Sequence, residues 1–274
     1  MQINMWESIE QGKKYGKRLA EKVLDMKAVC IWIALLIVGS NCFAQQPNPN
    51  YFSLGAVGLY MPEYEGSDEM QLLGFPSIAF KKDRWQFDAV NGLRYNFSAD
   101  GNYSYGPLVH YFFGREESDS AYLTGLGDID YGLEMGAYLN YSLAGWTLGG
   151  SVHRDLSKQV GGLRLKLAAD RMFMLNRSNM LSVQVDTEWV DEKYADAFFA
   201  ISTEQALATD YSVYNASKGL KHAGVSATWI HIVNPHWQAI VGVNAKVLVG
   251  SAVDSPLVFD DTLISTVAGV VYRF

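Results

Sequence analysis

The last nine residues, "TVAGVVYRF" from Thr266 to Phe274, decide the fold of this chain. Chain ends are usually poorly ordered and polar unless something ties them down, but this one ends on an aromatic residue. Its residues alternate between two rows. One predicted outward-facing row holds Thr266, Ala268, Val270, Tyr272 and Phe274, and the other holds Ser265, Val267, Gly269, Val271 and Arg273. A period of two over this length predicts a β-strand.

The same period of two recurs along the chain and gives each predicted strand one apolar and one polar face. Clear examples are 131–141, 181–189 and 237–249. These runs reach nine residues or more, whereas strands of soluble proteins average about five or six. Tyr and Trp recur near their ends, as in the aromatic girdles of strands that cross an outer membrane. The chain is therefore predicted to be all-β, a transmembrane antiparallel up-and-down β-barrel rather than a soluble sandwich.

We expect twelve strands, an even number that brings both termini to the periplasmic side. The candidates are 51–61, 71–81, 84–97, 103–113, 129–141, 145–154, 161–171, 179–190, 194–203, 219–233, 236–249 and 262–274. Ten strands is the alternative, because the second and ninth are weak. Pro76 interrupts the second and either demotes it or places a bulge there.

The strand count assigns each connection to one side of the membrane. It makes 81–83 and 234–235 tight periplasmic turns, and 62–70, 204–218 and 250–261 outward loops. It also places the long segment 114–128 in the periplasm, where turns are normally short. Either the count is wrong by one before this segment, or the segment has a task in the periplasm or folds into the lumen.

The N-terminal region predicts export. Residues 26–44 combine a charged start, an apolar run and a small-residue exit, which is the layout of a cleaved signal peptide. Residues 1–25 precede a better start at Met26 and are expected to be a mis-assigned extension, which leaves 45–274 as a single barrel domain. Both cysteines, Cys30 and Cys42, leave with the signal peptide. The predicted location is the outer membrane of a Gram-negative bacterium.

Composition and motifs exclude several functions. The formal charge of −7 argues against nucleic acid, because phosphate binding needs a basic face. Ser151 and His153 lie two residues apart, but "GGSVH" is not the G-x-S-x-G of a nucleophile elbow. The five histidines show no short metal-ligand spacing. We therefore predict a non-enzymatic protein with no catalytic residues, no metal site and no cofactor.

Charged residues on the polar strand faces are the candidate lumen residues. They are Arg94, Glu134, Arg164, Lys166, Asp186, Glu188 and Lys246. Paired charges could brace a narrow barrel from inside, because an unpaired buried charge is costly. The alternative is the lining of a solute-selective pore. We favour the brace, because twelve strands enclose much less space than the sixteen of open porins.

Several short stretches, in order along the chain, resemble the MipA/OmpV family of outer-membrane proteins, named for the MltA-interacting protein. They are "PEYEGSDE" at 62–69, "FPSI" at 75–78, "LTGLGDIDYGLEMG" at 123–136, "ADAFFAISTEQA" at 195–206, "DSPLV" at 254–258 and the closing "VVYRF". The chain departs from the family pattern near Ala197–Ala200. The resemblance implies a barrel without known catalytic residues. It also implies, from the founding member, a scaffold that joins a lytic transglycosylase to a peptidoglycan synthase.

These observations support three hypotheses. The first is a scaffold for murein-remodelling enzymes, with 114–128 as its periplasmic feature. The second is a narrow passive channel for small solutes, and the third is an adhesin that acts through its outward loops. In each case the expected partners include outer-membrane lipid, lipopolysaccharide and the barrel-assembly machinery. Tyr272 and Phe274 are the expected assembly signal, in a last strand that pairs with the first and closes the barrel.

Overall fold

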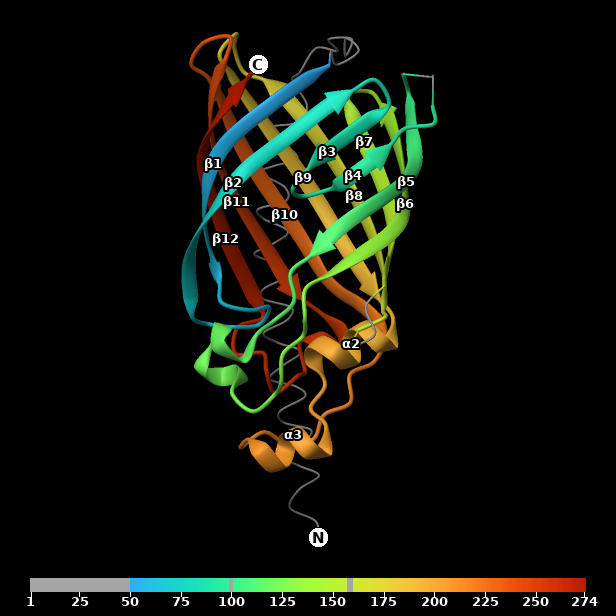
Figure 1. Cartoon of the computed structure of the whole chain (residues 1–274), viewed down its shortest axis with the longest axis vertical. Coiled ribbons are helices and arrows are strands. Elements are labelled where there is room, and N and C mark those ends of the chain that lie inside the picture. Colours follow the sequence, from blue (N-terminus) through green and yellow to red (C-terminus); the bar gives the residue numbers. More distant parts are fainter. Residues whose placement is uncertain (1–49, 99–100, 157–159) are drawn as a thin grey trace. The chain divides into compact units, whose positions relative to one another are not determined.

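A computed structural model describes residues 50–98, 101–156 and 160–274, and these form a β-barrel (Figure 1). The predicted extension at 1–25 and signal peptide at 26–44 lie outside the described residues. Among the residues that are described, no helix is long and apolar enough to cross a membrane.

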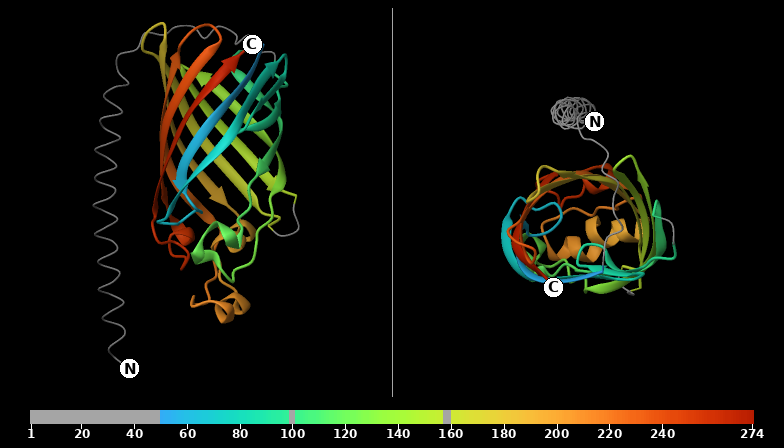
Figure 2. Two further views of the ribbon diagram at one scale, coloured as in Figure 1. Left: turned by 60° about the vertical axis from the view of Figure 1, so that its left-hand side comes forward. Right: turned by 90° about the horizontal axis from the view of Figure 1, so that it is seen from above.

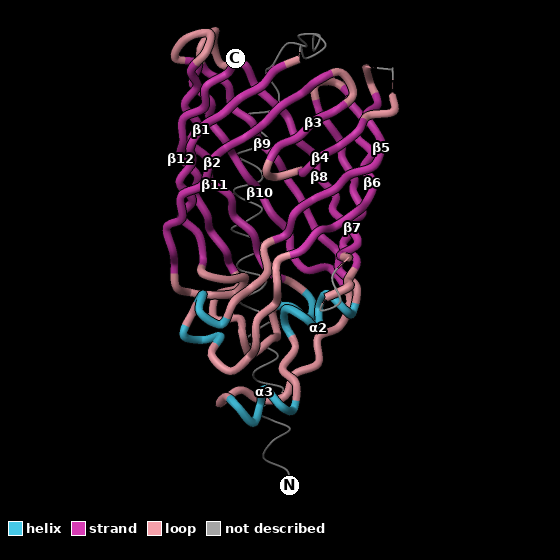
Figure 3. The backbone as a smooth tube through the Cα atoms, viewed as in Figure 1, coloured by secondary structure: helices cyan, strands magenta, loops and turns pink. Residues whose placement is uncertain are grey.

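Twelve antiparallel strands follow one another around the barrel, and the last pairs with the first (Figure 3). They are β1 (Tyr51–Pro62), β2 (Met70–Lys82), β3 (Trp85–Asp88), β4 (Gly92–Tyr95), β5 (Tyr103–Phe112), β6 (Gly132–Leu143), β7 (Trp146–Asp155), β8 (Leu163–Met174), β9 (Asn179–Val190), β10 (Gly219–Ile232), β11 (Trp237–Leu248) and β12 (Thr262–Arg273). The prediction of a closed, twelve-stranded, up-and-down barrel is confirmed.

The predicted count was right although two of the predicted strands were wrong. The stretch 84–97 is not one strand but the short hairpin of β3 and β4. Its turn forms because the Asp88 carboxylate accepts hydrogen bonds from the backbone N–H groups of Val90 (3.0 Å) and Asn91 (2.8 Å). At the turn's end Gly92 has a φ of 71°, and an added Cβ would lie 2.2 Å from the Val109 carbonyl oxygen. Only glycine fits there without strain.

The second error is at 194–203, which is largely helix rather than strand. Helix α2 spans Glu192–Phe199, and the side chain of its N-cap, Asp191, accepts a hydrogen bond from the N–H of Tyr194. Such a cap satisfies one of the N–H groups that a helix leaves open at its start. One strand gained and one lost leave the total at twelve.

The extra strand before residue 113 changes the side to which each connection belongs as far as 194–203, where the missing strand restores the predicted sides of 204–218, 234–235 and 250–261. The loop containing 114–128 lies at the same end as the loops 63–69, 191–218 and 249–261 (Figure 1). The opposite end carries short turns such as 144–145 and the C-terminus. Because outer-membrane barrels have short periplasmic turns and longer outer loops, the short-turn end is the periplasmic one. The placement of 114–128 in the periplasm was therefore wrong.

The two faces of the strands divide as the alternation predicts. In β12, Thr266, Ala268 and Val270 are exposed on the outer surface, while the residues between them are partly buried. Aromatic pairs gather near the periplasmic rim: Trp85 with Tyr95 at 4.9 Å between ring centroids, Tyr103 with Tyr141 at 4.7 Å, and Trp237 with Tyr272 at 5.1 Å. This arrangement matches one aromatic girdle of a membrane-spanning barrel.

Strand pairing around the barrel is least extensive beside the short hairpin of β3 and β4. Strand β2 pairs with β3 only at Phe80–Lys82, so its stretch from Met70 to Ala79 has β1 as its one ladder partner among the described strands. Pro76 lies in this stretch. Proline lacks the N–H of a ladder bond and belongs at such an edge, so it neither ends the strand nor requires a bulge.

The outer loops fold into a cap with its own apolar core. The cap holds α2, α3 (Thr203–Ala208) and three single turns of 3-10 helix, η1 (Glu117–Asp119), η2 (Ala121–Leu123) and η3 (Gly250–Ala252). Buried Phe199 and Leu248 belong to one apolar cluster, and Tyr64, Leu123 and Leu257 to a second. Seen along the barrel axis, α2 lies inside the outline of the strands (Figure 2). The cap therefore covers the outer mouth.

Candidate functional site

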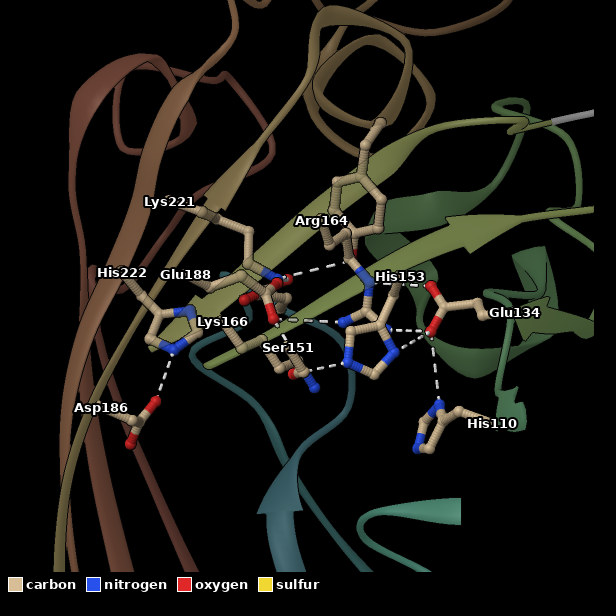
Figure 4. Close-up of polar contacts among 12 residues, drawn as sticks. His110, Glu134, Ser151, His153, Arg164, Lys166, Asp186, Glu188, Lys221 and His222 are labelled. Atoms are coloured by element: carbon tan, nitrogen blue, oxygen red, sulfur yellow. Dashed lines mark hydrogen bonds and ion pairs between the residues drawn. The ribbon is translucent and has the colours of Figure 1, made fainter. Parts of the chain in front are cut away.

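Arg164 on β8 is the centre of a buried ion-pair network just beneath the cap (Figure 4). Its Nε donates to Glu134 Oε1 at 2.8 Å, and its Nη2 makes a further short contact with Oε2 of the same carboxylate. Its Nη1 donates to Glu188 Oε2 at 3.2 Å. Glu134 and Glu188 are only 1% and 2% exposed. Because these residues come from β6, β8 and β9, the guanidinium joins three strands across the lumen face.

Lys221 on β10 extends the network to the outer loops. Its Nζ lies 2.8 Å from Glu188 Oε1 and 3.0 Å from Oε2 of Glu65, in the loop after β1. A register shift between Leu220 and His222 lets Lys221 and His222 both face the interior, where both are buried. Strict alternation would put these two neighbours on opposite faces. Lys221 was therefore missed by the alternating pattern, and a bulge is the reason.

Tyr194 of α2 covers the network from the outer side. The Lys221 Nζ lies 5.0 Å, and the Arg164 guanidinium carbon 5.5 Å, from the centre of the Tyr194 ring. Cations over an aromatic face are attracted to it, most strongly where water is excluded. Burial also raises the pKa of the Tyr194 hydroxyl above its usual range, so the phenol stays neutral. Tyr194 thus packs against the charged network without adding a charge of its own.

The seven predicted lumen charges all lie on the inner face, but they do not form one group. Glu134, Arg164, Lys166 and Glu188 belong to the network around Arg164, which we call the charged belt together with Lys221 and Glu65. Asp186 forms a second group in which it lies 2.9 Å from His222 Nε2. Lys246 is across the ladder from Gly224, which in turn pairs with Asp186. Arg94 is apart from both, 3.4 Å from Asp88 and over the ring of Tyr138.

Two histidines that the sequence did not connect meet at Glu134. His110 on β5 and His153 on β7 each place Nδ1 3.4 Å from Glu134 Oε2. His110 and Glu134 face each other in the β5–β6 ladder, and His153 faces Gly136, two residues further along β6. Sequence spacing hid this cluster because its members come from three neighbouring strands, 24 and 19 residues apart. The ligand atoms lie within 4.8 Å of one another, close enough to hold a metal ion.

Ser151, His153 and Glu134 also resemble the order of groups in a serine hydrolase. Ser151 Oγ lies 2.9 Å from His153 Nε2, and His153 Nδ1 lies 3.4 Å from Glu134 Oε2. Acyl transfer further requires donors aimed at the developing oxyanion. Ser151 is a mid-strand residue, paired with Tyr138 on one side and Lys166 on the other, so nearby backbone N–H groups serve the ladders. Backbone N–H groups engaged in this way are not available as oxyanion donors.

Comparison with known proteins places the chain among outer-membrane barrels. The model of the family described as MltA-interacting protein MipA matches residues 54–274. The chain belongs to the MipA family. No protein with a curated description matches it.

Solved structures similar to this MipA-family barrel match it at low sequence identity. The NanC porin is 10% identical, with 80% of this chain and 98% of that chain covered and a TM-score of 0.45. An outer-membrane channel from Pseudomonas putida F1 is 13% identical, with 86% and 100% covered and a TM-score of 0.43.

The predicted assembly signal of this MipA-family chain lies at the barrel seam. The Phe274 N–H donates to the Phe52 carbonyl oxygen at 3.0 Å, and the two rings lie 5.4 Å apart. Tyr272 faces Leu54 in the β1–β12 ladder and stacks on His236. Both aromatic side chains therefore lie where the last strand meets the first.

Proposed function

We propose that this chain is a non-enzymatic outer-membrane scaffold, in which the barrel is a braced frame rather than an open pore. One observation carries the proposal: the charged belt beneath the outer mouth is internally paired and covered by α2. Glu134 pairs with Arg164, Glu188 pairs with Arg164, Lys166 and Lys221, and Lys221 is 5% exposed. Charges that bind passing solutes would need to face water, whereas these hold strands and cap together.

The family description supplies the class of partner. The family is described by its interaction with MltA, and the resemblance of this chain implies a lytic transglycosylase and a peptidoglycan synthase on the periplasmic side. The corrected position of 114–128 removes that segment as the docking site, because it lies at the outer end. Under this proposal the partner binds the periplasmic turns instead.

Two of those turns form a joined surface suited to protein binding. The turns 175–178 and 233–236 are linked by a hydrogen bond of 2.7 Å from the Ile232 N–H to the Ser178 carbonyl oxygen. They expose Leu175 (58%) and Val233 (60%) beside Arg177. An apolar patch next to a charge is typical of protein interfaces.

Capture of a lytic transglycosylase from detergent extract by the purified barrel tests the scaffold. The double variant Leu175→Ser, Val233→Ser should capture less enzyme than the wild-type barrel. Leu207→Ser is the matched control, because Leu207 is an exposed leucine (86%) on α3 at the outer end. Absence of capture by the wild-type barrel, or equal capture by all three proteins, would remove the proposal.

A narrow channel is the second candidate, and a different region of the lumen favours it. The inner wall of β10, β11 and β12 carries Ser226, Thr228, Asn244 and Ser265, around a recess of about 180 Å³ beside Gly242. Small polar side chains suit a water-filled path. Planar-bilayer recordings decide between the candidates, because a channel of this kind should conduct and Lys246→Glu should shift its ion selectivity. Silent bilayers with folded protein would exclude it.

A further inference from the structure

The strand register brings His110, Glu134 and His153 together on the lumen face of three consecutive strands, β5, β6 and β7 (Figure 4). Each histidine Nδ1 lies 3.4 Å from the same oxygen, Glu134 Oε2. Two imidazole nitrogens and a carboxylate oxygen are a common ligand set for zinc and related divalent metals.

The two nitrogen–oxygen distances agree with a metal ion bound by the three residues, whose ligand atoms all lie within 4.8 Å of one another. Zinc binds imidazole nitrogen and carboxylate oxygen at about 2.0–2.2 Å in a tetrahedral arrangement, which separates neighbouring ligand atoms by about 3.3 Å. Both nitrogen–oxygen separations are 3.4 Å. Three protein ligands would leave a fourth position for water.

The hydrogen bonding of the histidines also points to a ligand. Neither Nδ1 atom makes a well-aligned hydrogen bond to the described residues, where its partner is Glu134 Oε2 at 3.4 Å, and the His153 side chain is only 5% exposed. Buried polar atoms are nearly always bonded, so each exception needs an explanation. If His153 donates from Nε2 to Ser151 Oγ at 2.9 Å, its Nδ1 lone pair points toward the Glu134 carboxylate. A metal cation between His153 Nδ1 and the Glu134 carboxylate would be bound by both, so the repulsion between the lone pair and the carboxylate would be relieved.

The surroundings hold the three ligands in place. Metal-binding histidines usually hydrogen-bond through their second ring nitrogen, and metal-binding carboxylates are themselves hydrogen-bonded. Ser151 performs the first role for His153. Arg164 performs the second through its 2.8 Å bond to Glu134 Oε1 and its contact with Oε2, the oxygen that faces the two histidines.

We propose that His110, Glu134 and His153 form a lumen-facing binding site for Zn²⁺ or a similar divalent transition metal. The site does not depend on whether the barrel is a scaffold or a channel.

The test uses the full barrel, purified in detergent, stripped with a chelator and titrated with Zn²⁺ by calorimetry. We expect one Zn²⁺ per chain, and a Co²⁺ complex with the visible absorption of four-coordinate cobalt. His110→Ala and His153→Ala should abolish saturable binding, and Glu134→Gln should do so without a change in side-chain size. Ser151→Ala, which removes only the partner of a ligand, should weaken binding about 10- to 100-fold.

His222→Ala is the matched control, because His222 is also a buried lumen histidine but is paired with Asp186 on a different part of the wall. It should bind Zn²⁺ like the wild-type barrel. Each variant must keep the compact gel mobility of an unheated barrel. Absence of saturable Zn²⁺ binding by the wild-type barrel would overturn the proposal. So would binding that survives in the folded double variant His110→Ala, His153→Ala, or Ca²⁺ and Mg²⁺ binding of equal strength.

Discussion

Tyr194 packs directly on Gly162, so closely that a Cβ added to the glycine would lie 2.7 Å from the Tyr194 Cβ. This contact joins the start of β8 to helix α2, which covers the outer mouth of the barrel. Any larger residue at 162 would need backbone movement, because a backbone atom of Tyr194 lies equally near, with its nitrogen at 2.8 Å. Because Gly162 has no side chain, Tyr194 and helix α2 can pack closely against the start of β8 and cover the outer mouth.

Gly162→Val should displace α2 and loosen the cap. We expect faster cleavage of the segment 191–218 by an added protease and a larger conductance in planar bilayers, because the helix can no longer reach the charged belt. Gly219→Val is the control, since an added Cβ there meets nothing within 4 Å. Equal protease sensitivity of the two variants would show that the close contact does not hold the cap.

Arg164→Met should strongly destabilise the barrel. Removing the guanidinium leaves the buried Glu134 carboxylate without its cationic partner and takes one of three cations from Glu188. Breaking a buried pair in this way costs about 3–5 kcal/mol. Urea unfolding in detergent, followed by gel mobility, measures the loss in free energy of unfolding.

Arg154→Met provides the comparison for Arg164→Met. Arg154 is half exposed and lies 4.0 Å from Asp191, so its loss should cost less than about 1 kcal/mol. A similar cost for both variants would mean that the charged belt does not brace the barrel.

Deleting Phe274 should impair assembly. The residue contributes both a backbone hydrogen bond and a ring contact to Phe52 at the seam that closes the barrel. We expect lower outer-membrane levels of the deletion variant, measured in isolated membranes, than of Asp261→Asn, which changes an outer loop. The assembly role would be refuted by equal levels of the two proteins.

Ser151 should not react as a catalytic nucleophile. Incubation of the folded barrel with a fluorophosphonate probe should give no covalent label, because the backbone N–H groups around Ser151 serve the strand ladders on both sides and are not available as oxyanion donors. Labelling of the wild-type barrel that disappears in Ser151→Ala would instead reveal a hydrolase in the lumen.

Where the sequence misled, local chemistry competed with the alternating pattern. Residues 84–97 alternate well enough for one strand, but Asp88 and Gly92 turn the chain midway. Residues 194–203 contain strand-like aromatics, but the Asp191 cap and the docking of Tyr194 favour a helix. Both signals extend over only three or four residues. They are therefore harder to detect in a sequence than a period of two that extends over ten residues.

The candidate site was predictable only in part. Glu134, Arg164, Lys166 and Glu188 follow from alternation, because side-chain direction in a strand depends on parity alone. The inward position of Lys221 does not follow from alternation, because the bulge between Leu220 and His222 changes which residues of β10 face the interior.

The sequence by itself determined the barrel, its two faces and the aromatic seam at Phe274, because these follow from periodicity along single strands. The tertiary structure alone decided which residues meet. His110, Glu134 and His153 are distant in sequence and adjacent in register, and α2 covers the mouth because Gly162 leaves room for Tyr194. Such contacts depend on strand register and on the folding of loops, which involve residues far apart in the chain.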